Sequence, residues 1–278
     1  MLFDVLIVGG GPAGLSAAVN VAARGKTCAV LANDYRRNPL YKAQVIDNYL
    51  GMRGVSGQQM LDRMQEEAVR AGAAFYTGRV VSVLPVEDRF MAALGDTMLE
   101  GRRAILATGA LSAPFLEGEA ALVGQGVSYC ATCDGMLYRG RAAVVTGTAD
   151  DLAEEANFLQ EIGVRVTVAT RRRPESLAPG VSWVEASRLA IRQDKGRLAG
   201  VEADGKLLPC DAVFILRSVM APDSLVPGLE LDGRFIRVNR RQETNIPGLY
   251  AAGDCTGKPL QIAKAVGEGL IAGQEACR

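Results

Sequence analysis

Short uninterrupted apolar runs, each followed by a turn rich in small residues, are the dominant pattern along the chain. Residues 5–8 and 142–145 contain no polar side chain, as is typical of strands covered on both faces of a parallel sheet. Residues 15–25 follow the first run after a glycine-rich turn, and their small side chains predict a helix closed by Gly25. This order of strand, turn and helix predicts an α/β fold.

The spacing of apolar residues predicts further helices and strands in other segments. Residues 58–71 predict a helix that carries Met60, Leu61, Met64 and Ala68 on one face, a pattern that favours packing in the core over contact with a cofactor. Residues 77–83 predict a strand. Near the C-terminus, a short strand that begins at Leu249 is followed by a helix over residues 261–276.

The turn after the first strand has the spacing Gly9-x-Gly11-x-x-Gly14. Glycines at this spacing allow a tight turn, let the backbone approach a pyrophosphate, and bring the helix close to the strand. The strand before it and the helix after it strengthen this interpretation. The next strand, over residues 27–31, should end at an acid that binds a ribose, but Ala32 and Asn33 follow it. Asp34 can substitute only if that strand ends late.

A second part of the same site is predicted near the C-terminus. Gly253 and Asp254 follow the strand that begins at Leu249, which places a carboxylate at the carboxyl edge of a sheet, where it can accept hydrogen bonds from a ribityl or ribose hydroxyl. The helix that starts at Gln261 can direct its first N–H groups at a flavin ring. The sequence therefore predicts an FAD domain built from two separate segments.

Composition removes several classes of function. Lys+Arg and Asp+Glu are equal, at 31 each, so charge gives no reason to expect a nucleic-acid or membrane partner. The acidic residue in the first four positions (MLFD) argues against a signal peptide, and six cysteines without one predict a cytoplasmic protein. The chain has no histidine, which excludes Ser-His-Asp hydrolysis, Cys-His proteolysis and His-ligated metal sites.

The tetrad Cys130-Ala131-Thr132-Cys133 and the adjacent Asp134 carry the most specific chemistry in the sequence. Cysteines at this spacing can form a small reducible disulfide, and a neighbouring carboxylate can move a proton as the bond opens. The other four cysteines form no second close pair, so a zinc site is not predicted. A nucleotide site and a dithiol in one chain predict a redox enzyme, with a non-enzymatic flavoprotein scaffold as the alternative.

Together, these motifs resemble the low-molecular-weight thioredoxin reductases over nearly the whole chain. The stretch VSYCATCDG at residues 127–135 is almost identical to the redox-active segment of that family. The resemblance implies two Rossmann-like domains of the three-layer ββα type, the second inserted into the first. The FAD domain would comprise residues 1–110 and 226–278, and the pyridine-nucleotide-type domain, residues 111–225, would carry the dithiol.

The resemblance also implies roles for individual residues. Cys133 would face the flavin, Cys130 would attack the disulfide of a thioredoxin-like protein, and Asp134 would be the acid–base group. The protein would be a homodimer. The FAD-binding residues carried over by the resemblance are Gly9, Gly11, Pro12, Ala13, Gly14, Gln44, Asn48, Val80, Thr108, Gly109, Gly253, Asp254, Gln261 and Ile262.

The second predicted nucleotide turn departs from the family. In Gly147-Thr148-Ala149-Asp150-Asp151-Leu152, the Cβ of Ala149 stands where a pyrophosphate must approach the backbone, and two carboxylates lie nearby. Leu152 replaces a small residue that lets the helix approach the strand. Downstream, Arg171, Arg172 and Arg173 retain two arginines where the family binds the NADPH 2′-phosphate, although three arginines also suit a solvated turn.

The sequence therefore predicts that NADPH is a poor electron donor, and that a reduced ferredoxin or a second flavin takes its place. Two alternatives remain open at this point. One is an ordinary NADPH-dependent thioredoxin reductase. The other is a flavin-dependent dithiol oxidase, although fungal-type enzymes of that kind usually carry a histidine near the dithiol and this chain has none.

Overall fold

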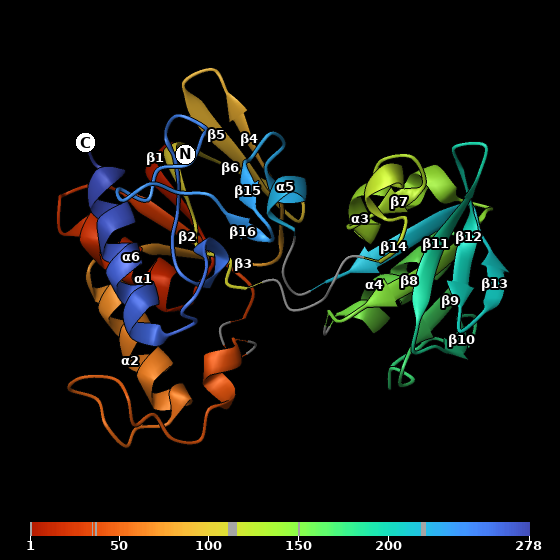
Figure 1. The fold of residues 1–278 in the computed structure, drawn as a ribbon, viewed down its shortest axis with the longest axis horizontal. Coiled ribbons are helices and arrows are strands. Elements are labelled where there is room, and N and C mark those ends of the chain that lie inside the picture. The colour runs from red at the N-terminus through yellow and green to blue at the C-terminus, as the bar shows by residue number, and fades with distance from the viewer. Residues whose placement is uncertain (1, 35, 37, 111–115, 150, 218–220) are drawn as a thin grey trace. The chain divides into compact units, whose positions relative to one another are not determined.

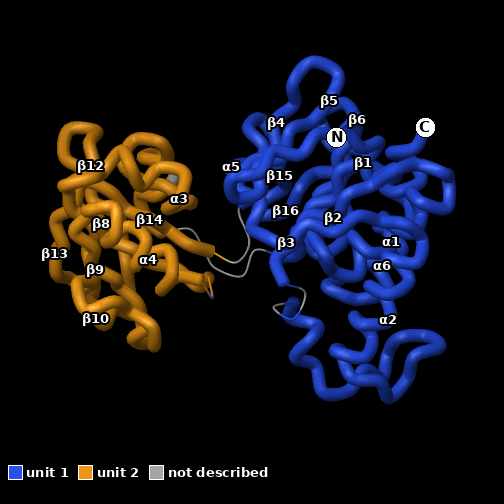
Figure 2. The backbone as a smooth tube through the Cα atoms, turned by 180° about the vertical axis from the view of Figure 1, so that it is seen from behind, with its two compact units in different colours: residues 1–111, 219–278 blue, residues 112–218 orange. Residues whose placement is uncertain are grey.

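The computed structural model describes residues 2–34, 36, 38–110, 116–149, 151–217 and 221–278. The chain divides into two compact units (Figure 2). Unit 1 comprises Met1–Leu111 and Val219–Arg278, and unit 2 is Ser112–Ser218. The second boundary precedes the position suggested by sequence because the short helix α5, Pro222–Leu225, packs on a strand of unit 1.

Unit 1 is built on a seven-stranded sheet in the order β3-β2-β1-β6-β5-β4, with β17 pairing with β6 (Figure 1). The pairs among β3, β2, β1, β6 and β17 are parallel, whereas β4, β5 and β6 form an antiparallel meander. The strands are β1 Leu2–Val8, β2 Cys28–Ala32, β3 Ala74–Thr77, β4 Val80–Val86, β5 Arg89–Leu94, β6 Thr97–Leu106 and β17 Leu249–Ala251. A separate hairpin pairs β15 Leu231–Asp232 with β16 Phe235–Ile236.

The helices of unit 1 are α1 Pro12–Ala22, α2 Gly57–Arg70 and α6 Ile262–Glu275, with the 3-10 turns η2 Pro39–Lys42 and η5 Asp254–Thr256. Helices α1 and α6 lie against each other, and small residues make this possible. A Cβ on Gly269 would lie 2.1 Å from Ala13 O, and one on Gly273 would lie 2.7 Å from Ala17 O. The alanine-rich composition of α1 is therefore explained by its contact with α6.

Unit 2 has a parallel five-stranded sheet in the order β10-β9-β8-β14-β7. Its strands are β7 Val127–Ser128, β8 Ala142–Gly147, β9 Arg165–Thr170, β10 Ser182–Glu185 and β14 Ala212–Leu216. An antiparallel sheet is formed by β11 Leu189–Asp194, β12 Arg197–Ala203 and β13 Lys206–Pro209. The helices are α3 Ala131–Asp134 and α4 Leu152–Glu161, with the 3-10 turns η3 Ala120–Leu122 and η4 Gly135–Tyr138.

The α/β fold expected from the sequence is confirmed by both parallel sheets. Helix α1 begins at Pro12, three residues earlier than expected, because proline is well suited to the first helical turn. The strand expected over residues 77–83 is wrong as a single element. Gly78, with φ 156°, separates β3 from β4, so that the chain leaves the parallel part of the sheet and enters the meander.

The predicted helix over residues 58–71 corresponds to α2, and its apolar face lies in the core as expected. Met60, Leu61 and Ala68 are fully buried, and Met64 packs against the same cluster. No helix within the described ranges is long and apolar enough to cross a membrane.

Candidate functional site

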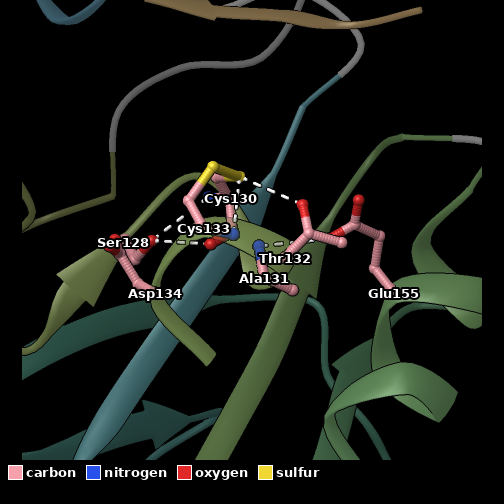
Figure 3. The surroundings of a disulfide bond; sticks show 7 residues. All are labelled: Ser128, Cys130, Ala131, Thr132, Cys133, Asp134 and Glu155. Carbon is pink, nitrogen blue, oxygen red and sulfur yellow. Dashed lines mark hydrogen bonds between the residues drawn. A yellow bond between two sulfur atoms is a disulfide. The ribbon is translucent and has the colours of Figure 1, made fainter. Parts of the chain in front are cut away.

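The tetrad forms a disulfide between Cys130 and Cys133 in unit 2 (Figure 3). It lies where β7 ends and the single turn of α3 begins, with Cys130 as the residue that precedes the helix. Cys130 is buried, with 7% of its surface exposed, whereas Cys133 is exposed. The backbone N–H of Cys133 donates to Cys130 Sγ at 3.1 Å, which would stabilise negative charge on that sulfur once the disulfide opens.

Asp134 is held beside the disulfide by Ser128. The Ser128 hydroxyl donates to Asp134 Oδ2 at 2.7 Å, and Ser128 Oγ in turn accepts the Cys130 backbone N–H at 3.1 Å (Figure 3). Burial, and then the charge of Asp134, raise the pKa of the nearby Tyr138 hydroxyl. The sequence-predicted triplet of Cys130, Cys133 and Asp134 is thus brought together, and Ser128 is an addition that sequence reasoning did not single out.

Three of the four remaining cysteines are buried. Burial raises the pKa of Cys28 to about 11, of Cys210 to about 12 and of Cys255 to about 11. A raised thiol pKa keeps the group protonated at neutral pH, where a thiol is a poor nucleophile. These cysteines are therefore inert members of the core.

A buried ion pair lies next to the tetrad. Arg217 makes a bidentate pair with Glu119, with Nη1 to Oε1 at 2.6 Å and Nη2 to Oε2 at 2.7 Å, and Glu119 has no exposed surface. The Tyr129 hydroxyl donates to Glu119 Oε1 at 2.8 Å, and the Leu116 N–H donates to Oε2 at 2.7 Å. Because Tyr129 directly precedes Cys130, this network fixes the chain on the N-terminal side of the disulfide. Its two charged members, Glu119 and Arg217, are 98 residues apart in sequence, and no motif could have identified their pairing.

The first nucleotide turn has the shape that its glycines predict. A Cβ on Gly14 would lie 1.9 Å from Gly9 O, and a Cβ on Gly9 would lie 2.1 Å from Ala107 O, so both positions require glycine. In the part of the chain that the structure describes, the N–H groups of Gly10 and Gly11 have no hydrogen-bond partner. Helix α1 starts at this turn without a side-chain cap or an acidic residue in its first turn. These features fit a pyrophosphate.

The Gly253-Asp254 segment lies at the end of β17, as predicted, and a small network holds it on α6. Glu268 Oε2 accepts the Gly253 N–H at 2.8 Å and the Thr256 hydroxyl at 2.8 Å. Lys264 donates to Gly253 O at 2.7 Å and pairs with Glu268 at 3.1 Å. Burial raises the pKa of Asp254, and the positive charge of Lys264 opposes that effect. Sequence reasoning missed Lys264 and Glu268, although their i, i+4 spacing on a helix is a recognisable signal.

Two predicted cofactor residues from distant parts of the chain are in contact. Asn48 Nδ2 donates to Gln261 Oε1 at 2.9 Å, and Gln261 is the residue that precedes α6. Ile262 begins that helix. Of the other predicted residues, Gln44 is exposed, and Val80 is buried at the start of β4.

Thr108 and Gly109 follow β6 at the same edge of the sheet as Gly9, which follows the neighbouring strand β1. The Cys255 thiol contacts Thr108, and Gly109 has φ 78°, a conformation that favours glycine. Strand β2 does not end late, so the condition under which Asp34 could replace the ribose-binding acid is not met. The strand stops at Ala32, and Asp34 lies two residues further on.

The second nucleotide turn, after β8, has a different geometry. The N–H groups of Thr148 and Ala149 both donate to Leu216 O, at 2.8 and 3.0 Å. Ala149 packs against the core of unit 2, and Leu152 is buried in that core. Asp150, whose negative charge was expected to oppose a pyrophosphate, lies outside the described residues.

Negative charge is concentrated at the start of the helix that follows this turn. Asp151 precedes α4, and Glu154 and Glu155 lie in its first turn. Glu155 Oε2 accepts the Ala131 N–H at 3.1 Å, which links α4 to the dithiol segment (Figure 3). Carboxylates at this position oppose the binding of a second anion.

The arginine run follows β9, and all three side chains are exposed. Asp204 lies close enough to Arg171 for that arginine to contribute to the lowered pKa of the carboxyl, after the larger effect of hydrogen bonds from the Ser187 and Arg188 N–H groups. Trp183 lies in unit 2, on β10, and donates from Nε1 to Thr170 Oγ1 at 3.0 Å. This hydrogen bond joins the neighbouring strands β10 and β9.

Comparison with known proteins supports the same picture. The family model described as pyridine nucleotide-disulphide oxidoreductase matches residues 3–269. The thioredoxin reductase of Bacillus subtilis (strain 168) is 28% identical over 295 residues, which cover 98% of this chain and 93% of that protein.

Two solved structures are similar over almost the whole chain. A ferredoxin-flavin thioredoxin reductase from Clostridium acetobutylicum is 36% identical with a TM-score of 0.90, and the match covers 99% of this chain and 96% of that one. A thioredoxin reductase from Gloeobacter violaceus is 32% identical with a TM-score of 0.83, covering 100% of this chain and 93% of that one.

Proposed function

Because the chain belongs to the pyridine nucleotide-disulphide oxidoreductase family, we propose that it passes electrons from a reduced ferredoxin, through FAD, to the Cys130–Cys133 disulfide. A thioredoxin-like protein disulfide would be the final acceptor. The chain is a thioredoxin reductase-like oxidoreductase, and its family implies FAD. The donor and the acceptor are the parts that the proposal adds.

The FAD would be held by unit 1. The Gly9–Gly14 turn and the start of α1 suit the pyrophosphate, since two N–H groups and a positive helix end are directed there without competing charge. Asp254 would accept hydrogen bonds from hydroxyl groups of the cofactor, and the Asn48–Gln261 pair would lie by the flavin. When bound, FAD supplies a carrier of two electrons that can reduce a disulfide.

The dithiol then performs ordinary thiol–disulfide exchange. Two electrons and two protons convert the Cys130–Cys133 disulfide into two thiols, and Asp134 is placed to move one of the protons. The Cys130 thiolate attacks the acceptor's disulfide to form a mixed disulfide, and Cys133 displaces the reduced acceptor and restores the internal bond. Cys130 is the buried sulfur of the pair, so its surroundings must open before it can attack a protein.

One observation supports the choice of electron donor. The N–H groups of Thr148 and Ala149 both donate hydrogen bonds to Leu216 O. These N–H groups belong to the turn that would bind the pyrophosphate of NADPH, and they are already paired within the protein. Carboxylates also lie at the start of the next helix. The similarity to a protein named ferredoxin-flavin thioredoxin reductase supports ferredoxin as the replacement. A second flavin as donor has no comparable support.

The three exposed arginines after β9 favour a second candidate, the ordinary NADPH-dependent thioredoxin reductase, because arginines bind phosphate well. The same side chains suit an acidic protein carrier, whose approach they would steer. A homodimer and a cytoplasmic location also belong to the proposal, and size-exclusion chromatography tests the first of them.

The dithiol part of the proposal is tested with cysteine variants. Cys130→Ser and Cys133→Ser should each abolish reduction of a thioredoxin disulfide while FAD content stays at the wild-type level. Cys210→Ser, in the same unit but inert by burial, should retain turnover. Normal turnover in both tetrad variants would show that the redox centre lies elsewhere. The donor is tested separately, by anaerobic reduction with NADPH and with ferredoxin.

A further inference from the structure

A carboxylate of helix α4 contacts the segment that carries the disulfide (Figure 3). Glu155 is half-buried, and its Oε2 accepts the Ala131 N–H at 3.1 Å. Ala131 is fully buried and directly follows Cys130, the sulfur that is expected to attack the acceptor. Since a carboxylate is ionised at neutral pH, this contact holds a negative charge beside the residue that must itself become negative during the reaction.

The Cys130 sulfur also has groups around it that favour negative charge. The Cys133 N–H donates to Sγ at 3.1 Å, and the Thr132 hydroxyl lies 3.4 Å from the same sulfur, where it can donate to a thiolate. Glu155 acts in the opposite direction, because a like charge nearby disfavours ionisation. The free energy of a thiolate on Cys130 is therefore a balance between these donors and the carboxylate of α4.

The charged and titratable groups on the other elements around Cys130 leave this effect in place. Glu119, which precedes η3, and Arg217, which follows β14, are paired with each other. Asp134 adds a negative charge at the end of α3. The Tyr138 hydroxyl on η4 is neutral at pH 7, because burial, and then the charge of Asp134, raise its pKa. Among these groups, negative charge exceeds positive charge.

Given the dithiol function proposed above, we propose that Glu155 is a positioning residue whose charge makes the reduced Cys130–Cys133 pair a stronger reductant. Its hydrogen bond to Ala131 holds the start of α3, and its carboxylate repels a thiolate on Cys130. Opening of the disulfide takes up the two electrons that FAD carries and two protons, and the repulsion destabilises the thiolate form of the product. A dithiol whose reduced form is destabilised passes its electrons on more readily, which suits the reduction of another protein's disulfide.

The first test is the pH dependence of thiol alkylation. In the FAD-containing Cys133→Ser protein, Cys130 is the only thiol of the tetrad, and its reaction with iodoacetamide is followed by peptide mass spectrometry. Glu155→Gln keeps an oxygen that can accept the Ala131 N–H and removes the charge. The midpoint of the rate profile should fall by about 0.5–1 pH unit. Glu154→Gln is the matched control, because it removes the same charge from the same helical turn at an exposed position, and should leave the midpoint unchanged.

The second test is the reduction potential of the tetrad with both cysteines present. The protein is equilibrated without oxygen in mixtures of reduced and oxidised dithiothreitol, at a pH above the alkylation midpoint, and the disulfide fraction is measured by thiol trapping. Glu155→Gln should reach half reduction at a ratio of reduced to oxidised dithiothreitol about threefold to tenfold lower than the wild type, the change that corresponds to the expected shift of the midpoint.

An unchanged alkylation midpoint or an unchanged ratio at half reduction in Glu155→Gln would overturn the role of Glu155 and leave the proposed function intact. An equal shift in Glu154→Gln would also overturn it, since the effect would then not depend on the contact with Ala131. Normal turnover of a protein disulfide by Cys130→Ser would instead overturn the function of the dithiol itself. If Glu155→Gln fails to fold, Glu155→Ala decides: a lowered midpoint would support the role of the charge, and an unchanged one would contradict it.

Discussion

The turns after β1 and after β8 occupy equivalent places in two similar folds, yet among the described residues only the second turn pairs the N–H groups of its second and third residues within the protein. In unit 1, the N–H groups of Gly10 and Gly11 have no partner among the described residues, and α1 begins at once with Pro12. In unit 2, the equivalent N–H groups of Thr148 and Ala149 are both donated to Leu216 O. A Rossmann-like unit can therefore keep its parallel sheet while the turn after its first strand packs into the core.

The helix after each turn makes the same distinction. Helix α1 begins three residues after Gly9, whereas α4 begins five residues after Gly147, at Leu152. The later start removes the helix end from the turn, and Glu154 and Glu155 then place negative charge in its first turn. Unit 2 instead carries the disulfide, and the Glu155 side chain bonds the Ala131 N–H of that segment. The helix after the second turn is thus linked to the dithiol segment.

The largest expected difference is between valine substitutions at matched positions of the two turns. Gly11→Val should yield protein without FAD, because the new side chain would occupy the space of the pyrophosphate and displace the Asn38 amide. Ala149→Val, at the equivalent position of unit 2, should retain full FAD content and disulfide reduction. The measurement is the ratio of visible flavin absorbance to protein absorbance after purification. Full FAD occupancy in Gly11→Val would remove the distinction between the turns.

The next largest effect is expected at Asp134, beside the disulfide of unit 2. Asp134→Asn should slow reduction of a protein disulfide about 10²-fold or more, the range for the loss of a general acid. The amide can still accept the Ser128 hydrogen bond, so the disulfide should form normally. Steady-state turnover with thioredoxin as acceptor measures the change, and FAD content is the control. An unchanged rate would mean that Asp134 only positions Ser128.

A smaller effect should be seen in stability. Glu119→Gln would remove the carboxylate charge that pairs with the buried Arg217 and should lower the free energy of unfolding by about 3–5 kcal/mol. Chemical denaturation followed by the fluorescence of Trp183, which lies in unit 2, measures this directly. Glu202→Gln is the control, because its partner Arg192 is also paired with Glu117 in an exposed network, and its removal should change little. Equal stability of the two variants would contradict a special role for the pair beside the tetrad.

The smallest effect is expected from restoring glycines to the second turn. The double variant Ala149→Gly, Leu152→Gly should improve the dissociation constant for NADPH by less than about tenfold, because neither change frees the N–H groups from Leu216 O or removes Glu154 and Glu155. Isothermal titration with NADPH measures this, and disulfide reduction with a chemical donor verifies that the variant is intact. Micromolar affinity in the double variant would show that the glycines alone decide nucleotide binding.

Much of this architecture could be predicted because it depends on local patterns. Apolar runs, glycine spacing and the CxxC tetrad are encoded within a few residues, so both turns and the disulfide were placed correctly. The split between β3 and β4 was missed because a positive φ at Gly78 depends on tertiary context rather than on propensity.

The supporting network could not be predicted for a different reason. Glu119 and Arg217 are 98 residues apart in sequence and meet only when the fold is complete. The hydrogen bonds to Leu216 O also could not be predicted from the sequence, because they join backbone atoms, which are the same in nearly every residue. The sequence could therefore suggest that the second nucleotide site had changed but not how its N–H groups are used.

If ferredoxin is the donor, electrons reach the FAD without a nucleotide bound at the second turn. The most direct measurement is anaerobic bleaching of the flavin absorbance, with NADPH and with reduced ferredoxin as donors, at low and high ionic strength. We expect ferredoxin to bleach the flavin rapidly and more slowly as salt is added, since Arg171, Arg172 and Arg173 are exposed to an acidic carrier. NADPH should bleach it slowly even at millimolar concentration. Rapid, saturable bleaching by micromolar NADPH would contradict ferredoxin as the donor and identify an ordinary NADPH-dependent reductase.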